Sequence, residues 1–371
     1  MKFLTSRHVL ILMLTLLAIE GAFRIGLYEP LVNPMSHSGR TITMLRALAD
    51  FGLEKVNVIT LGDSRAAQGL NNRQINAASH TFGLEHVRMT MPGSHLLTFR
   101  TLTNWGFEKL PGLQGIVLLV SPASFNTLGA GAYELAKVLP IRNYTTPWEM
   151  LRHVPFERAD VRTYSSFSSL AGYREDIKNL LADPWARGRA IVTSNTAEPQ
   201  RFLNFSSNNS NDLCAIATDE PKTCLNELSN RRDEIPTKSW NALNTLCRAA
   251  GRKSKHGVPG EQAELLLQEW TLFLDELSQK VRVMLVIMPD HSIYQEKLYA
   301  PNAIWLSTRL VNNLRQRGKA EVLDLHHLIQ EQENPECSYY MDAKHLNKSG
   351  NAVLTQALLP ALENFWSQLE Q

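Results

Sequence analysis

The stretch LGDSRAAQGL, residues 61–70, places a serine where a nucleophile could act. It overlaps the end of the apolar run VNVITL, which predicts a buried strand, and Ser64 stands between that strand and a predicted helix. The backbone N–H of Ser64 and the N-terminus of the helix would help to stabilise an oxyanion. Ser64 is therefore a candidate nucleophile, and its alternative role is that of a turn serine that caps the helix.

A serine hydroxyl becomes reactive when a base lies within hydrogen-bond reach and a third group orients the base. The segment MDAKHLNKSG, residues 341–350, supplies both, because Asp342 and His345 are three residues apart on a loop or helix start. The carboxylate can fold back onto the imidazole, which fixes the tautomer of the histidine and stabilises the imidazolium. The sequence therefore predicts a triad of Ser64, His345 and Asp342.

Five short apolar runs, with helix-like stretches between them, must position these residues. The runs cover residues 56–61, 86–91, 115–120, 281–288 and 321–325. The predicted helices cover residues 66–78, 95–109, 262–280, 302–317 and 349–368. This alternation predicts an α/β fold with a doubly wound, parallel, five-stranded sheet, and such sheets carry their sites beyond the carboxyl ends of the strands.

A long insertion at residues 127–260 separates the third run from the fourth. Because a structureless loop of this length is implausible, we expect a helical subdomain or lid there. Its basic residues at 231–232 and 251–257 could meet an anionic polymer or lipid headgroups, although a solvated positive face is the commoner outcome. In the whole chain of 371 residues, 38 Lys and Arg against 36 Asp and Glu leave a net charge of +2, so composition gives no argument for nucleic-acid binding.

Residues 1–28 have the order of an export signal, with Lys2 and Arg7 before the apolar run VLILMLTLLAI. No clean small-x-small cleavage site follows this run. A single-pass anchor over residues 8–28 is therefore favoured over a cleaved signal and over a buried soluble helix. With an anchor or a signal, the remaining chain, including an α/β domain over residues 50–371, lies on the extracytoplasmic side of the cytoplasmic membrane.

The cysteines fit an oxidising compartment, because their even number permits two disulfides. The short spacing between Cys214 and Cys224 suits a small closed loop, which leaves Cys247 to pair with Cys337. Four buried thiols are the alternative. Their spacing matches no zinc site, and we expect no metal.

The motifs LGDSR and DAKHLN resemble the first and last conserved blocks of the SGNH (GDSL-like) hydrolase superfamily. This resemblance implies a flavodoxin-like sheet, with Ser64 as nucleophile, His345 as base and Asp342 as its partner. MPGSHL looks like the second block and implies the Gly93 N–H as an oxyanion donor beside that of Ser64. The third block, Gly-x-Asn-Asp, is missing, and VSPASFN in its place offers Asn126 as a substitute for the oxyanion-hole asparagine.

Arg65 directly after the serine, the N-terminal segment and the missing third block are similar to a membrane-tethered subgroup of that superfamily. The subgroup resembles the D-alanyl transfer protein of teichoic acid synthesis and the periplasmic acetylation proteins of alginate synthesis. It implies an O-acyltransferase that moves an acyl group from a donor to a cell-envelope glycan, beside a membrane-bound O-acyltransferase and without a cofactor. An esterase or deacetylase of the same substrates, a lipase, and a non-catalytic glycan-binding assembly factor are the alternatives.

Four further residues stand near the predicted site. Arg65 and His95 lie in or beside the first two motifs, and Asp290 and His291 follow the fourth apolar run in MPDHS. We interpret all four as candidates for substrate binding. Helix capping is the commoner role for Asp290 and His291, and His95 could simply begin a helix.

Overall fold

The computed structural model describes residues 6–125, 132–152, 165–195, 214, 221–235, 237–250, 260–292, 301–342 and 344–369. These residues belong to two compact units. A helical unit comprises Met1–Phe51, Leu97–Gly106 and Gly129–Phe202, and a sheet unit comprises Gly52–Leu96, Phe107–Leu128 and Leu203–Gln371. The predicted insertion at residues 127–260 is thus divided between the two units.

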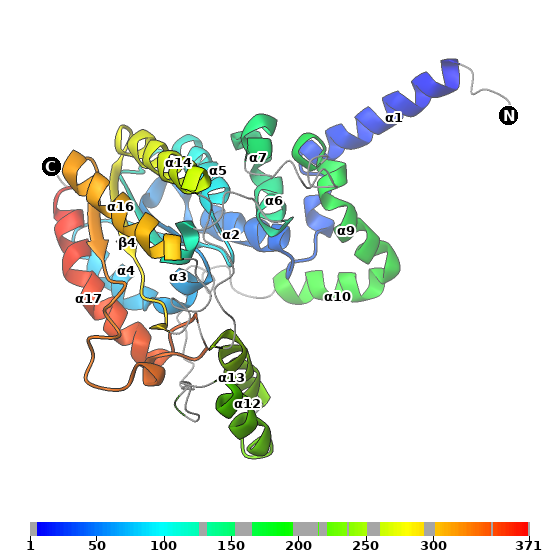
Figure 1. The fold of residues 1–371 in the computed structure, drawn as a ribbon. Helices are drawn as coiled ribbons and strands as arrows, with labels where there is room; N and C mark the ends of the chain where they lie inside the picture. The colour runs from blue at the N-terminus through cyan, green and yellow to red at the C-terminus, as the bar shows by residue number, and fades with distance from the viewer. Residues whose placement is uncertain are drawn as a thin grey trace. The chain divides into compact units, whose positions relative to one another are not determined.

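The sheet unit is built on five parallel strands, as the sequence predicts (Figure 1). The strands are β1 (Val56–Gly62), β2 (Glu85–Thr90), β3 (Gly115–Val120), β4 (Arg282–Ile287) and β5 (Glu321–Asp324). Their order across the sheet is β2-β1-β3-β4-β5. Because every neighbouring pair is parallel, the carboxyl ends of all five strands meet at one edge of the sheet.

The inner strands are mostly apolar because both of their faces are buried. Alternate side chains of β1, β3 and β4 form a single cluster with the inner face of helix α17 (Lys348–Ser367). Members of this cluster include Val58, Val117, Val286, Leu354, Leu358 and Trp366. The side chains between them along each strand point to the opposite face of the sheet. There, α14 (Gly260–Ser278) packs on β4, and α16 (Pro301–Arg317) packs on β5 and on α14.

The prediction of a single helix over residues 66–78 is wrong, because two helices occupy that stretch. Helix α3 (Ser64–Gly69) ends before Leu70, whose backbone is extended. Helix α4 (Asn72–His80) then begins at its own cap, where the Asn71 side chain accepts a hydrogen bond from the Gln74 N–H. An asparagine can cap a new helix in this way, whereas it stabilises a helix interior poorly.

The other predicted helices of the sheet core agree with the structure to within about two residues, the usual uncertainty of a helix end. Helix α5 (Leu96–Lys109) follows β2. Short 3-10 helices occupy Glu29–Leu31, Leu53–Lys55, Pro122–Phe125, Leu139–Tyr144 and Glu336–Tyr339, and the last of these, η6, precedes the DAKHLN motif.

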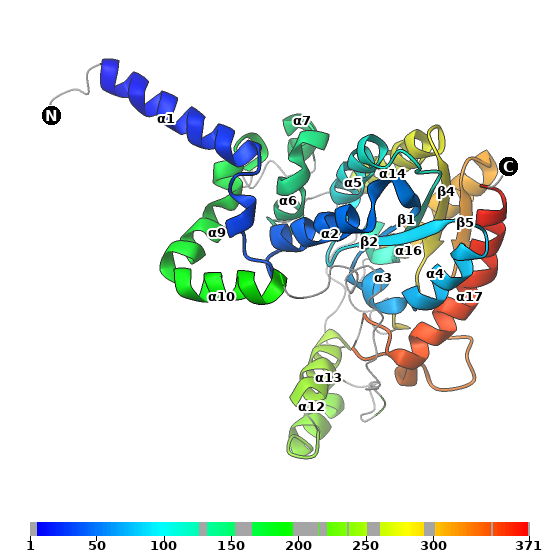
Figure 2. The ribbon, with the colours of Figure 1, turned by 180° about the vertical axis from the view of Figure 1, so that it is seen from behind.

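The disulfides differ from the predicted pairing, because Cys224 is joined to Cys247 and Cys214 to Cys337. Helices α12 (Pro221–Asn230) and α13 (Thr237–Ala250) lie side by side in both ribbon views (Figures 1 and 2). This arrangement brings the buried Cys224 and Cys247 face to face. Closing a loop between cysteines 23 positions apart stabilises a fold by about 3 kcal/mol through the entropy of the unfolded chain.

The helical unit contains α1 (Ser6–Arg24), α2 (His37–Phe51), α6 (Ala132–Val138), α7 (Pro147–Arg152), α9 (Ser169–Ala182) and α10 (Pro184–Asn195). The Glu20 carboxylate joins α1 to the start of α9, where it accepts hydrogen bonds from the backbone N–H groups of Ser169 and Leu170. These N–H groups have no partner inside their own helix, so a carboxylate at this position stabilises the N-terminus of α9.

Helix α1 covers most of residues 8–28, where the sequence predicts a membrane anchor. No helix in the described part of the chain has the length and the apolar character that a membrane span needs. The expected N-terminal membrane helix is therefore not found.

Candidate active site

Ser64, His345 and Asp342 lie together at the carboxyl edge of the sheet. Ser64 Oγ is 2.8 Å from His345 Nε2. His345 Nδ1 lies 2.8 Å from Asp342 Oδ2 and 3.0 Å from Oδ1. Because the carboxylate can only accept a hydrogen bond, Nδ1 carries the proton and Nε2 is free to accept one from the serine hydroxyl. This arrangement is that of a nucleophile, its base and the group that orients the base.

The turn that presents Ser64 depends on a close approach of backbone at the end of β1. A Cβ on Gly62 would lie 2.3 Å from Cβ of Ala66 and 2.9 Å from the carbonyl oxygen of Leu119. Only glycine fits there, so α3 can start directly over the end of the strand. Asp63 then caps α3, because its Oδ1 accepts a hydrogen bond of 2.8 Å from the Arg65 N–H. The cap fixes the first turn of α3, where Ser64 lies.

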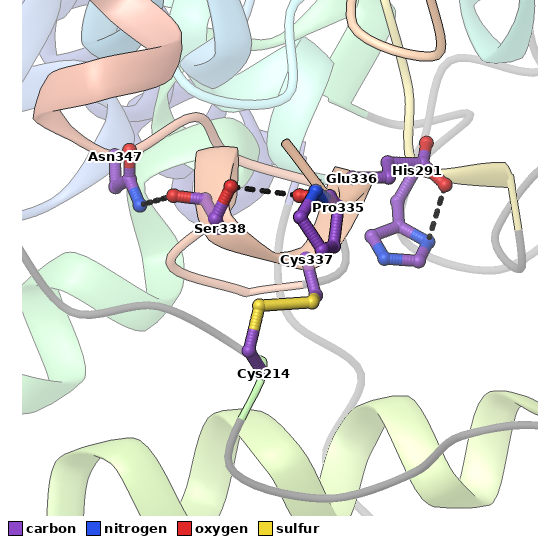
Figure 3. Close-up of a disulfide and its surroundings, with 7 residues drawn as sticks. All are labelled: Cys214, His291, Pro335, Glu336, Cys337, Ser338 and Asn347. Carbon is purple, nitrogen blue, oxygen red and sulfur yellow. Dashed lines mark hydrogen bonds and ion pairs between the residues drawn. A yellow bond between two sulfur atoms is a disulfide. The ribbon is translucent and has the colours of Figure 1, made fainter. Parts of the chain in front are cut away.

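The loop that carries Asp342 and His345 is held at both of its ends. Asn347 caps α17 through its Oδ1, and its Nδ2 donates a hydrogen bond of 2.7 Å to the Ser338 carbonyl. The Met341 N–H donates to the His345 carbonyl oxygen at 2.9 Å, which closes the loop. Figure 3 shows the Cys214–Cys337 disulfide at η6, on the side of the loop that precedes Asp342.

Asp342 is held as a carboxylate. Partial burial alone would raise its pKa, but the hydrogen bond and the charge of His345 lower it, as do the N–H groups of Lys344 and His345. The net result is a pKa below the usual range for aspartate. An ionised Asp342 stabilises the imidazolium that forms when His345 takes the proton of Ser64.

The candidate oxyanion donor Gly93 lies on the segment that follows β2. The Met91 N–H donates a hydrogen bond of 3.0 Å to the Gly62 carbonyl oxygen, so the segment after β2 begins beside the turn that presents Ser64. Gly93 follows in an exposed turn with a φ of +65°, a conformation that favours glycine. Asn126 lies outside the described residues.

Arg65 points into the protein and is only 7% exposed. Its Nη1 lies 2.9 Å from Asp63 Oδ2 and 2.6 Å from Ser121 Oγ, and its Nε lies 2.8 Å from Asp290 Oδ1. Asp290 is itself 1% exposed. Arg65 and Asp290, which the sequence offered as candidates for substrate binding, therefore form an ion pair with each other. Sequence reasoning missed Ser121, although its place directly after a buried strand was a usable signal.

The two histidines considered for substrate binding differ in their exposure. His95 is half-buried, directly before α5. His291 is buried against Tyr340, with its Nδ1 3.7 Å from Glu336 Oε2. Burial lowers the pKa of His291 and outweighs the nearby Glu336 carboxylate, which raises it. His291 is thus a neutral interior group near neutral pH.

No protein-family model matches this chain, and no match was found among curated protein sequences.

The lowered pKa of Asp342 predicts how the stability of the protein depends on pH. A carboxyl whose pKa is lower in the folded chain contributes stability above its unfolded pKa, near 4, and loses it as the pH falls through the folded value. We expect Asp342→Asn to lower the free energy of unfolding by a constant amount above about pH 5, and by progressively less below about pH 4. Urea unfolding at a series of pH values measures this difference.

The matched control is Asp233→Asn, which changes an exposed carboxylate between α12 and α13. If the Asp342→Asn difference stayed constant down to pH 2.5, the pKa of Asp342 would not be lowered in the folded protein.

Proposed function

We propose that this protein is a serine-dependent acyl-ester enzyme. The observation that carries the proposal is the 2.8 Å contact between Ser64 Oγ and His345 Nε2, with Asp342 on the other ring nitrogen. In the proposed reaction Ser64 Oγ attacks the acyl carbonyl, and its proton passes to His345 Nε2. The N–H groups of Ser64 and Gly93 stabilise the oxyanion.

The second half of the reaction releases the acyl group. The tetrahedral intermediate collapses, His345 gives its proton to the departing alcohol oxygen, and an ester of Ser64 remains. An acceptor hydroxyl then loses its proton to His345 and attacks this ester, and the same proton returns to Ser64 Oγ. An acceptor on a glycan gives transfer, whereas water gives hydrolysis, and the same residues serve both.

We propose further that the chain is an SGNH-type protein. The strand order β2-β1-β3-β4-β5 is the flavodoxin-like order, with a serine after the first strand and an Asp-x-x-His pair after the last. Among SGNH-like activities we favour O-acyl transfer to a cell-envelope glycan, with a membrane-bound O-acyltransferase as a partner. We favour transfer over hydrolysis because the Cys214–Cys337 disulfide holds Cys214 beside η6, before the loop of the proposed base, and a group fixed there can help to exclude water from the acyl-enzyme.

We place the protein on the extracytoplasmic side of the cytoplasmic membrane, held at the membrane by its N-terminal segment. Two disulfides support an oxidising compartment. In α1, the large apolar side chains between Val9 and Ile19 are 38% to 63% exposed. A surface of this kind on a helix beginning with basic residues suits contact with lipid.

Ser64→Ala is expected to lower the turnover of an activated acyl ester by roughly 10⁴-fold, because no other group supplies the nucleophile. The free energy of unfolding should change by less than about 1 kcal/mol, since a hydroxyl at this position contributes little packing. Ester hydrolysis and urea unfolding measure the two effects. Ser349→Ala, which alters an exposed serine at the start of α17, is the control. Full activity of Ser64→Ala would exclude Ser64 as the nucleophile.

Transfer is expected to exceed hydrolysis when a suitable acceptor is present. Water is far more concentrated than any glycan, so a transferase must position the acceptor hydroxyl and exclude water. The purified protein is given an activated acyl ester with and without envelope-glycan oligosaccharides, and mass spectrometry measures acylated glycan and free acid. Release of free acid that no acceptor diverts would indicate an esterase. Glycan binding without any turnover would indicate an assembly factor.

Export is expected to protect all four cysteines in cells. The full chain, produced in a bacterial host, should sediment with membranes and resist alkylation until its disulfides are reduced. A chain without residues 1–28, which should stay in the cytoplasm with free thiols, is the control. N-terminal sequencing distinguishes a retained segment from a cleaved signal. A soluble full-length protein with reactive thiols would contradict the proposed location.

A further inference from the structure

The buried cluster around Arg65 joins three neighbouring strands at the edge that carries the site. Asp63 follows β1, Ser121 follows β3 and Asp290 lies just beyond β4. The guanidinium of Arg65 contacts all three, at distances between 2.6 and 2.9 Å. In the sheet these strands lie side by side in the order β1-β3-β4. The cluster therefore fastens the strand ends beyond the last hydrogen bonds of the sheet.

The segment after β4 continues from this cluster to the loop of the catalytic base. Asp290 is bound to Arg65, and two residues later both the N–H and the Oγ of Ser292 donate to the carboxylate of Glu336, at 2.8 and 2.5 Å. Glu336 is the first residue of η6, the short helix that precedes Asp342. Residues 290–292 thus form a strut, which connects the turn that carries Ser64 (the nucleophile turn, residues 62–65) to the loop that carries Asp342 and His345 (the base loop, residues 341–347).

Packing supports the strut along its length. Between its two polar ends, the His291 ring lies edge-on to the buried ring of Tyr340, with 5.1 Å between the ring centroids. Figure 3 shows His291 and Glu336 joined beside the Cys214–Cys337 disulfide. Two residues beyond Tyr340 the chain reaches Asp342, so the strut ends next to the triad.

We propose that Arg65 is a positioning residue, which holds Ser64 at hydrogen-bonding distance from His345 through Asp63 on one side and through Asp290, Ser292 and Glu336 on the other. This inference rests on the proposed acyl-ester activity. Arg65 is buried, and its Nη1 and Nε contact other side chains, so it acts through them and not by binding substrate.

Arginine is suited to this role by its shape. Its planar guanidinium is wide enough for Nη1 to donate hydrogen bonds to Asp63 and Ser121 while Nε forms an ion pair with Asp290, and these partners follow three different strands. The single ammonium of a lysine keeps the charge but cannot reach all three partners together. Arg65→Lys therefore loosens the arrangement without leaving Asp63 and Asp290 as unpaired buried charges.

The experiment compares the full-length wild-type protein with Arg65→Lys. A fluorophosphonate probe titrates the fraction of molecules with a reactive serine, and p-nitrophenyl acetate turnover gives kcat and KM per titrated site. We expect Arg65→Lys to retain near-complete titration and a KM within about twofold of the wild-type value, while kcat per site falls roughly 10- to 100-fold. A merely structural role would lower the titrated fraction and leave kcat per site unchanged.

Arg282→Lys is the matched control, because Arg282 pairs with Glu321 at the opposite end of β4 and β5. Its kcat per site should stay within about twofold of the wild-type value. The strut itself is tested by Glu336→Gln, alone and with Arg65→Lys. If the two residues act through one strut, the double variant should lose less kcat than the product of the two single losses.

Two results would overturn the inference while the proposed function stands: an unchanged kcat per site in Arg65→Lys, or a loss confined to the titrated fraction. Independent losses in the double variant would overturn the strut. If the wild-type protein neither reacts with the probe nor turns over the ester, the proposed function fails, and with it the role given to Arg65.

Discussion

The hydrogen bond between Ser64 Oγ and His345 Nε2 joins residues 281 positions apart, and the parallel sheet makes that contact possible. Because all five strands run in one direction, the loops after β1 and β5 leave the sheet at the same edge. The burial of β1, β3 and β4 on both faces fixes their register, since a slip of one residue would exchange the two faces of a strand. The site thus inherits its geometry from the apolar core.

Burying charged and ionisable groups costs free energy, and the candidate site contains several such groups. Arg65 and Asp290 are nearly inaccessible to water, and burial holds His291 neutral. Removing charges from water cancels most of the attraction between them, so a buried ion pair is weak evidence for stability. Such a pair instead fixes the orientation of its two side chains and the distance between the segments that carry them. Its location beside a closely packed turn that admits only glycine at position 62 is consistent with a role in positioning Ser64.

The strands and the convergence of Ser64, Asp342 and His345 were predictable because they follow from local signals: buried apolar runs, and polar motifs at the ends of parallel strands. The disulfide pairing was not, because spacing along the chain does not determine which cysteines approach within 5.0 or 5.6 Å between Cα atoms. The inward direction of Arg65 was missed for a similar reason. Its partners Ser121 and Asp290 are distant in sequence, and arginine is a residue type that usually lies at the protein surface.

In the proposed reaction, the choice between transfer and hydrolysis depends on which hydroxyl reaches His345 Nε2 after the acyl-enzyme forms, because the proposed base can accept a proton from a glycan hydroxyl or from water. The side chains of His345 and Asp342 are 16% and 34% exposed to solvent, so one side of the base loop is open to an acceptor. Cys337 lies five residues before Asp342, and its disulfide brings Cys214 of the insertion to the start of that loop. In the proposed reaction, an acceptor hydroxyl that enters from this open side can therefore lose its proton to His345 while Asp342 stays hydrogen-bonded to the other ring nitrogen.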